Sequence, residues 1–258
     1  MRGRRHLHPW VNPPHEEVVC LINTYPCNLP ADLERAKLQT LTRKIVDTLG
    51  VRPRIYRAGR YGVDPGREAM LAELGYLVDV SVVPYRSYAG FGGGPDFFGY
   101  PDAPFWSTAR RQVLFMPVTQ SLVGPLKSLA RKGFGKAIFG RAGSRLRAPG
   151  LLARLRLLER IALTPEGVTA AEMKRLIVSM IEGGHRVFSL SMHSPTFMPG
   201  GTPYVRDAQE LKALLRRVET ILDVFFGQLG GAPATPVEIR GALSGDADDA
   251  APRAVAAL

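Results

Sequence analysis

The feature that most constrains the fold is an alternation of helical and extended segments in the first third of the chain. Apolar residues recur at helical spacing over residues 31–49, and Gly50 can end that helix in a left-handed cap. Residues 51–56 predict a short strand, residues 65–74 a second helix, and residues 76–84 a buried strand. Because such repeats favour parallel strands joined by crossover helices, we expect an α/β protein.

A second segment of interest lies near residue 190. Residues 187–192, Val-Phe-Ser-Leu-Ser-Met, predict a short strand, and His193 follows at its end. In α/β proteins catalytic groups lie where strands end and loops begin. A histidine there can act as a general acid or as a metal ligand. The alternative is a histidine that is hydrogen-bonded to the backbone of the loop.

Two histidines lie close to the N-terminus. If the chain is extended there, His6 and His8 point to the same side and can share a metal. A zinc site normally takes three or four protein ligands, so two unrelated histidines remain the alternative.

Polar residues also follow the strand predicted at 51–56. Arg57, Arg60 and Tyr61, with two glycines, suit recognition of an anion or a sugar, and the alternative is a surface turn with solvated arginines. Asp79 interrupts a buried strand and therefore needs a partner. The arginines of the preceding strand end are its expected partners.

The net charge of +11 is concentrated in one segment. Residues 125–160 contain ten basic residues and one acid, Glu159, a net charge of +9. The basic residues are Lys127, Arg131, Lys132, Lys136, Arg141, Arg145, Arg147, Arg154, Arg156 and Arg160. Such a segment indicates an anionic partner, such as a membrane surface, a nucleic acid or an acidic glycan. The alternative is a solvated, mobile insertion that binds nothing specific.

Three other segments have recognisable patterns. Residues 85–106 form a loop rich in aromatic side chains, which either stack on sugar rings or hold the loop in place. Thr169 and Glu172 form a capping box that predicts a helix to about residue 182, and Asp207 starts another. The composition of residues 231–258 predicts a disordered tail.

Composition places the chain among ordinary soluble proteins, with 45% apolar and 22% charged residues. No stretch is apolar enough to cross a bilayer, and the basic N-terminus has no apolar core of a secretory signal behind it. Cys20 and Cys27 fit no zinc motif and define no disulfide framework. We therefore expect a cytoplasmic protein.

Four segments, in order along the chain, resemble those of a known family. They are His-Leu-His-Pro-Trp-Val-Asn-Pro-Pro at 6–14, Arg-Ala-Gly-Arg-Tyr-Gly at 57–62, Asp-Val-Ser-Val-Val-Pro at 79–84 and Leu-Ser-Met-His-Ser-Pro at 190–195. Together with Thr-Pro-Tyr-Val-Arg at 202–206, they resemble the polysaccharide deacetylases of carbohydrate esterase family four, the nodulation-type deacetylases. Each motif alone is unspecific, and the resemblance covers about residues 6–226.

The resemblance implies a distorted (β/α)7-type barrel, incomplete at its N-terminus. Residues 1–230 would form one deacetylase-like domain with a basic insertion at about 125–160. The implied reaction removes N-acetyl groups from an N-acetylated glycan or a lipid-linked sugar. A divalent metal, usually zinc, would activate the attacking water.

The resemblance also implies roles for individual residues. His193 matches the general acid that protonates the departing amine. The implied metal ligands are His6 and His8, Arg57 and Asp79 are the catalytic arginine and its carboxylate partner, and the substrate-binding residues are Arg60, Tyr61, Trp10, Ser194 and Pro195.

The chain departs from the family pattern in two places. Trp10 stands where the second metal histidine is usual, so His8 is expected to replace it. No aspartate precedes His6, where the family has a strand ending in two aspartates. We expect coding sequence upstream of Met1 to supply that strand, and the chain to be inactive without it.

Two alternatives to an active deacetylase remain. One is a catalytically inactive member that binds a glycan through the aromatic loop and the arginines. The other is a scaffold that binds an anionic surface through residues 125–160, with no specific nucleic-acid partner.

Overall fold

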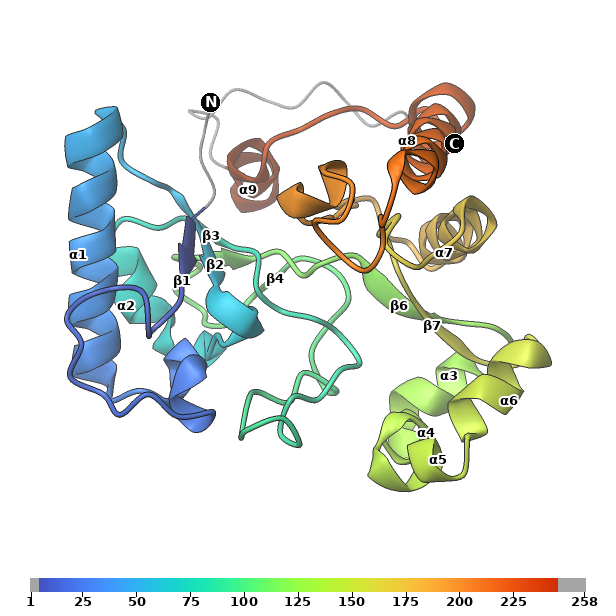
Figure 1. The fold of residues 1–258 in the computed structure, drawn as a ribbon, viewed down its shortest axis with the longest axis horizontal. Coiled ribbons are helices and arrows are strands. Elements are labelled where there is room, and N and C mark those ends of the chain that lie inside the picture. The colour runs from blue at the N-terminus through green and yellow to red at the C-terminus, as the bar shows by residue number, and fades with distance from the viewer. Residues whose placement is uncertain (1–4, 246–258) are drawn as a thin grey trace. The chain divides into compact units, whose positions relative to one another are not determined.

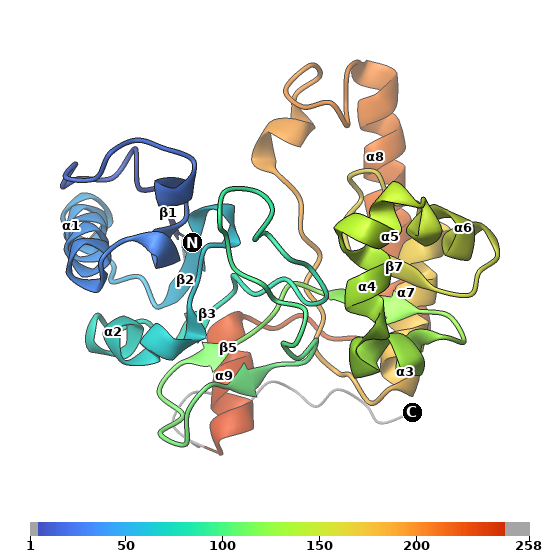
Figure 2. The same ribbon diagram turned by 90° about the horizontal axis from the view of Figure 1, so that it is seen from below.

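The computed structural model describes residues 5–245, apart from the side chains of Arg5, His6, Arg141 and Ala142 (Figures 1 and 2). The chain divides into two compact units. Unit 1 runs to Pro117 and includes the segment that starts at Ala234, and unit 2 comprises Val118–Pro233. Within the described residues, no helix combines the length and the apolar character needed to cross a membrane.

Helix α1 (Ala31–Leu49) has the bounds predicted from its sequence. Leu38 and Ile45 lie on its buried face, as the helical spacing requires. Gly50 ends the helix in the left-handed conformation, with φ +66°, and its backbone N–H donates to the Val46 carbonyl at 2.8 Å.

The sheet of unit 1 has the strand order β1–β2–β3–β5–β4. Its strands are β1 (Arg5–Leu7), β2 (Ile55–Ala58), β3 (Val78–Asp79), β5 (Leu114–Phe115) and β4 (Phe105–Trp106). Strands β1, β2, β3 and β5 pair in parallel, and β4 is antiparallel to β5. The parallel pairing confirms the α/β prediction. Within residues 5–245 the strands form open sheets and no closed barrel.

The register of this sheet brings the predicted motifs of unit 1 together. His6 pairs with Arg57, and Tyr56 pairs with Asp79. Because the strands are parallel, the segments that leave β1, β2 and β3 meet at one edge of the sheet.

Short helices complete unit 1. They are η1 (Ile22–Thr24), η2 (Pro26–Asn28), η3 (Gly59–Tyr61), η4 (Pro65–Arg67), α2 (Glu68–Glu73) and α9 (Pro236–Ser244). Helix α9 corrects the prediction of a disordered tail for residues 236–244, while residues 246–258 lie outside the described residues. Thr235 and Glu238 form a capping box at its start, and the Arg240 guanidinium lies 5.7 Å from the centre of the Trp106 ring. These contacts stabilise a helix in a segment whose composition predicted disorder.

Unit 2 is built on the antiparallel pair β6 (Gln120–Val123) and β7 (Glu159–Ala162). Helices α7 (Ala170–Glu182) and α8 (Ala208–Leu222), with the π-helical η7 (Asp223–Gln228), complete it. The core comprises Val123, Ile161, Leu163, Met173, Leu176, Ile177, Met180, Ile221 and Val224. Both predicted helix starts are confirmed, because the side chains of Thr169 and Asp207 accept hydrogen bonds from the backbone of their helices.

The basic segment forms a cluster of short helices beside β7 in unit 2 (Figure 1). They are α3 (Lys127–Leu129), η5 (Ala130–Phe134), α4 (Gly135–Phe139), α5 (Arg141–Arg145) and α6 (Ala148–Arg154). The glycines interrupt the helices without preventing them. Gly133, for example, adopts φ +109° inside η5.

The predicted strand at 187–192 is not formed. Phe188 and Leu190 still pack against the core of unit 2, as alternation predicts. In place of a hydrogen bond to a neighbouring strand, the Ser189 N–H donates to the side-chain hydroxyl of Thr119 at 2.7 Å. The backbone bond from Ser191 N–H to the Leu163 carbonyl, at 3.1 Å, remains.

Candidate functional site

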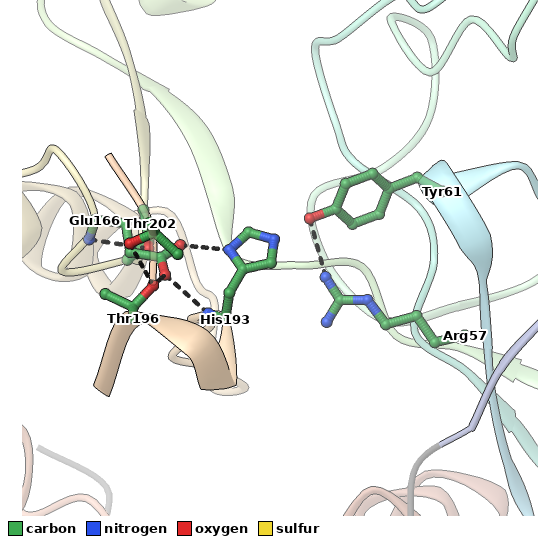
Figure 3. Close-up of polar contacts among 7 residues, drawn as sticks. Arg57, Tyr61, Glu166, His193, Thr196 and Thr202 are labelled. Atoms are coloured by element: carbon green, nitrogen blue, oxygen red, sulfur yellow. Dashed lines mark hydrogen bonds and ion pairs between the residues drawn. The ribbon is translucent and has the colours of Figure 1, made fainter. Parts of the chain in front are cut away.

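His193 forms a pair with a buried glutamate of unit 2 (Figure 3). Glu166 lies in the turn that follows β7, and His193 immediately precedes the 3-10 helix η6 (Ser194–Phe197). His193 Nδ1 lies 2.7 Å from Glu166 Oε2, and the His193 backbone N–H donates to Glu166 Oε1 at 2.8 Å. The imidazole is therefore held by a carboxylate, not by the loop backbone that the alternative prediction named.

Hydroxyl groups hold Glu166 itself in place. The Thr196 hydroxyl donates to Glu166 Oε1, and the Thr202 hydroxyl donates to Thr196 Oγ1 at 3.2 Å. The Glu166 backbone N–H donates to Thr164 Oγ1 at 3.2 Å. Thr196 therefore holds the Glu166 carboxylate, and Thr164 holds the Glu166 backbone.

The electrostatics of the pair favour an ionised glutamate. Burial acts to raise the pKa of Glu166, but the hydrogen bonds from Thr196 and His193 and the charge of His193 outweigh it and lower that pKa. An ionised carboxylate can only accept hydrogen bonds, so the His193 proton in this contact lies on Nδ1. The Glu166 side chain is 5% exposed and that of His193 is 66% exposed. Nε2 is then the ring nitrogen with which His193 can reach a reacting group.

The loop after His193 depends on a close backbone approach. A Cβ on Gly201 would lie 2.3 Å from the Pro195 carbonyl oxygen, so this position requires glycine. Ser194 and Pro195, the predicted substrate-binding residues, are exposed next to His193. Both side chains therefore lie at the surface from which His193 is accessible.

The predicted metal ligands lie at the start of unit 1. The backbone of His6 is in β1, but its side chain is outside the described residues. Strand β1 ends at Leu7, and the backbone N–H of His8 donates to Asn12 Oδ1 at 2.9 Å as the chain turns. His8 therefore lies beyond the extended chain on which the prediction relied.

His8 has a low affinity for protons in this position. Burial, and then the positive charge of Arg60, lower the pKa of His8. Its ring centre is 4.8 Å from that of Trp10, which is 40% exposed. A neutral imidazole suits metal binding, but the described side chains contain no group of three or more His, Cys, Asp or Glu that could hold a metal. Among the described side chains His8 is a candidate ligand, so the implied zinc site would need His6, whose side chain is outside the described residues, and a further donor.

Arg57, Tyr61 and Arg60 do not form a solvated turn. Arg57 Nη2 donates to the Tyr61 hydroxyl at 2.9 Å, as Figure 3 shows. The Tyr61 ring stacks on Tyr88, with ring centres 5.9 Å apart. Arg60 donates to the Tyr25 hydroxyl at 3.1 Å and lies over its ring.

The aromatic loop contacts this turn. Tyr88, Phe97, Tyr100 and Phe105 form a chain of ring contacts with centres 5.5–6.3 Å apart. Rings that contact one another support the alternative in which they hold the loop in place. Phe91, which is 62% exposed, is the loop ring most available to a ligand.

Asp79 finds its partner locally and not among the arginines. Its two carboxylate oxygens accept hydrogen bonds from the backbone N–H and the hydroxyl of Ser81, both at 2.8 Å. Burial raises the pKa of Asp79 to about 7, although Ser81 and the charge of Arg57 oppose the change. Arg57 therefore acts on Asp79 through its charge, and Ser81 is the partner that sequence reasoning missed.

Sequence reasoning also missed the residue that fixes the His8–Trp10 segment. The fully buried Lys37 ammonium of α1 donates to the carbonyls of Pro9, Asn12 and Pro14 and pairs with Glu17 at 2.9 Å. Burial opposes ionisation, but the hydrogen bond from Lys37 lowers the pKa of Glu17 overall. One cation thus holds the loop that carries two predicted site residues.

Each unit also contains a cavity. In unit 1 a cavity of about 210 Å³ lies between Cys27, Asp64 and Phe97, where burial raises the pKa of the Cys27 thiol to about 12. In unit 2 a cavity of about 470 Å³ lies between the basic helices and β7–α7, lined by Phe139, Arg160 and other residues. None of the predicted site residues lines either cavity.

Comparisons of the chain with protein-family models, with curated proteins and with solved structures found no match.

Proposed function

We propose that this protein is a hydrolase that removes N-acetyl groups from an N-acetylated glycan or a lipid-linked sugar, with His193 as the general acid. The observation that supports it most directly is the contact between His193 Nδ1 and the buried carboxylate of Glu166, at 2.7 Å. A histidine that is exposed at one ring nitrogen and anchored at the other by a carboxylate is suited to proton transfer.

The chemistry of amide hydrolysis explains why such a group is needed. Water adds to the acetyl carbon and loses one proton to the solvent. The carbon–nitrogen bond then breaks to give acetic acid and an amine, and the proton that leaves acetic acid as it becomes acetate restores the protonated histidine. The amine is a poor leaving group unless its nitrogen gains a proton. In our proposal protonated His193 gives that proton from Nε2, and the anionic Glu166 stabilises the imidazolium until the transfer occurs.

The substrate class comes from the resemblance of the motifs around Arg57, Asp79 and His193. A divalent metal is part of the same proposal, with His8 the described candidate ligand. The proposal extends to the fold, in which the parallel strands of unit 1 would correspond to part of the seven-stranded distorted barrel of such enzymes. We also propose a cytoplasmic location, which suits the two free thiols Cys20 and Cys27.

The direct test is the release of acetate from N-acetylglucosamine oligosaccharides by the protein in its full-length form and by two variants of it. His193→Ala should reduce kcat by about 10²–10⁴-fold, because general acid catalysis contributes that much. His15→Ala, which removes an exposed imidazole elsewhere, is the matched control and should leave kcat unchanged.

Three outcomes would overturn this proposal. A His193→Ala variant with the wild-type rate would remove His193 from the mechanism. A full-length wild-type protein that releases no acetate but binds the oligosaccharides would indicate a glycan-binding protein without turnover. A chain that neither binds nor cleaves them would exclude this substrate class.

A further inference from the structure

We infer that the helical cluster α3–α6 is a docking surface for membranes that contain anionic phospholipids. The observation that leads to it is the composition of residues 125–158, which include nine lysines and arginines and no aspartate or glutamate. The segment therefore has a high density of positive charge, and an anionic surface is complementary to such a charge.

The apolar side chains of the cluster distinguish a membrane from other anionic partners. Leu129, Phe134, Leu146, Leu151 and Leu155 are between 53% and 81% exposed. Single exposed apolar residues are common on protein surfaces, but five within 27 residues of short helices are a local concentration. Acyl chains can take up such side chains, whereas the phosphates of a nucleic acid cannot.

The exposed residues of the two kinds alternate along the chain. Leu146 lies between Arg145 and Arg147, and Leu155 lies between Arg154 and Arg156, all of them exposed. Arginine and lysine side chains beside leucines can contact phosphate headgroups while the leucines enter the acyl boundary. This is the arrangement of segments that lie on a membrane without crossing it.

The helices present these residues from a folded platform. Helices α3–α6 contact one another, and α6 contacts β7 of unit 2. Lys127 and Arg131 attach the start of the cluster by donating to Ser179 and Ser121. The leucines and arginines further along the cluster are therefore held at the surface by a defined fold.

The experiment is a vesicle co-sedimentation assay with the full chain. Vesicles of phosphatidylcholine with about 30% phosphatidylserine should bind the protein, and vesicles of phosphatidylcholine alone should not. Binding should weaken as NaCl is raised to 0.5 M, because salt screens the contacts with the headgroups.

Two triple variants separate the charged and the apolar contributions. Arg145→Gln/Arg147→Gln/Arg154→Gln should weaken binding by roughly 100-fold, because each basic residue at an anionic surface contributes about fivefold. Leu146→Ser/Leu151→Ser/Leu155→Ser keeps the charge and should weaken binding at least about tenfold if the leucines enter the membrane.

Matched controls remove the same groups from other exposed positions. Arg43→Gln/Lys44→Gln/Lys212→Gln removes three charges outside the cluster, and Val19→Ser/Leu49→Ser/Val51→Ser removes three apolar side chains. Both controls should bind vesicles as the wild type does. A Leu146→Trp variant, compared with the wild type, should show a blue shift in tryptophan emission when anionic vesicles are added.

The inference is independent of catalysis by His193. It is overturned if the chain does not bind the anionic vesicles at 0.1 M NaCl, or if the leucine variant binds them as the wild type does. Tight, salt-sensitive binding to duplex DNA or RNA in place of vesicles would also overturn it, and would assign the basic helices to nucleic acid.

Discussion

At the scale of the residue, the pKa values of two buried carboxylates shift in opposite directions. Glu166 is surrounded by donors that lower its pKa, so it is ionised and can stabilise a protonated His193. The fully buried carboxylate of Asp79 accepts hydrogen bonds from Ser81, and its pKa rises to about 7. The number and kind of donors around each carboxylate decide whether it is charged at neutral pH.

Asp79 should make the stability of the protein depend on pH. Its pKa is raised on folding from 3.8 to about 7, so its stabilising effect is complete below pH 3.8 and is lost as pH rises towards 7. Between pH 5 and pH 8, the free energy of unfolding of the wild type should fall by about 1–3 kcal/mol relative to that of Asp79→Asn.

Chemical denaturation of both proteins at several pH values measures this difference. Taking the difference removes the contribution of His8, whose lowered pKa acts in the opposite direction. Parallel stability curves for the two proteins would show that Asp79 does not titrate in this range.

At the scale of the element, the sequence predicted long helices better than strands and contacts. Helix α1 and the starts of α7 and α8 follow from spacing and caps, which are local properties. The prediction of a strand at 187–192 was wrong. There the Ser189 backbone bonds to the hydroxyl of Thr119, which is far away in the sequence, and not to the backbone of a neighbouring strand. The composition of residues 231–258 does not predict helix α9, because the start of the helix depends on the local capping box of Thr235 and Glu238.

Of the two residues that form the candidate site, only His193 could be predicted from the sequence, because the contact with Glu166 is not a local property. A histidine after an apolar run can be recognised from the sequence, and His193 was. Its partner, Glu166, is 27 residues earlier in a turn between proline and glycine, and no local pattern joins the two. A charged residue in the turn after β7 was the one available signal.

Lys37 provides a prediction at this scale, because it links α1 to the loop of residues 9–17. Lys37→Met would leave Glu17 as a buried charge without its cation and three carbonyls without their donor. We expect a loss of about 3–5 kcal/mol in the free energy of unfolding, measured by urea denaturation.

A control on the same helix distinguishes this effect from a general loss of charge. Lys44→Met, at an exposed position of α1, should change stability by no more than about 0.5 kcal/mol. Adding Glu17→Gln to Lys37→Met should recover part of the loss, because the buried charge is then removed. A Lys37→Met variant as stable as the wild type would contradict this role.

At the scale of the whole molecule, chemistry and charge occupy different segments of the chain. The His193–Glu166 pair carries the proposed reaction, and the basic helices of residues 125–158 carry most of the excess positive charge. The positive charge of residues 125–158 can be predicted from the sequence, whereas the helices that present these residues depend on packing against β7. The two proposals therefore fail or succeed through separate measurements.

The measurement that tests the central claim most directly is the kcat of Glu166→Gln for acetate release from N-acetylglucosamine oligosaccharides, with Glu182→Gln as the exposed control. Glutamine keeps the shape of Glu166 but cannot stabilise an imidazolium by its charge. We expect a fall in kcat of about 10²-fold or more with KM nearly unchanged, and a wild-type rate for the control. Turnover by Glu166→Gln at the wild-type rate would contradict it.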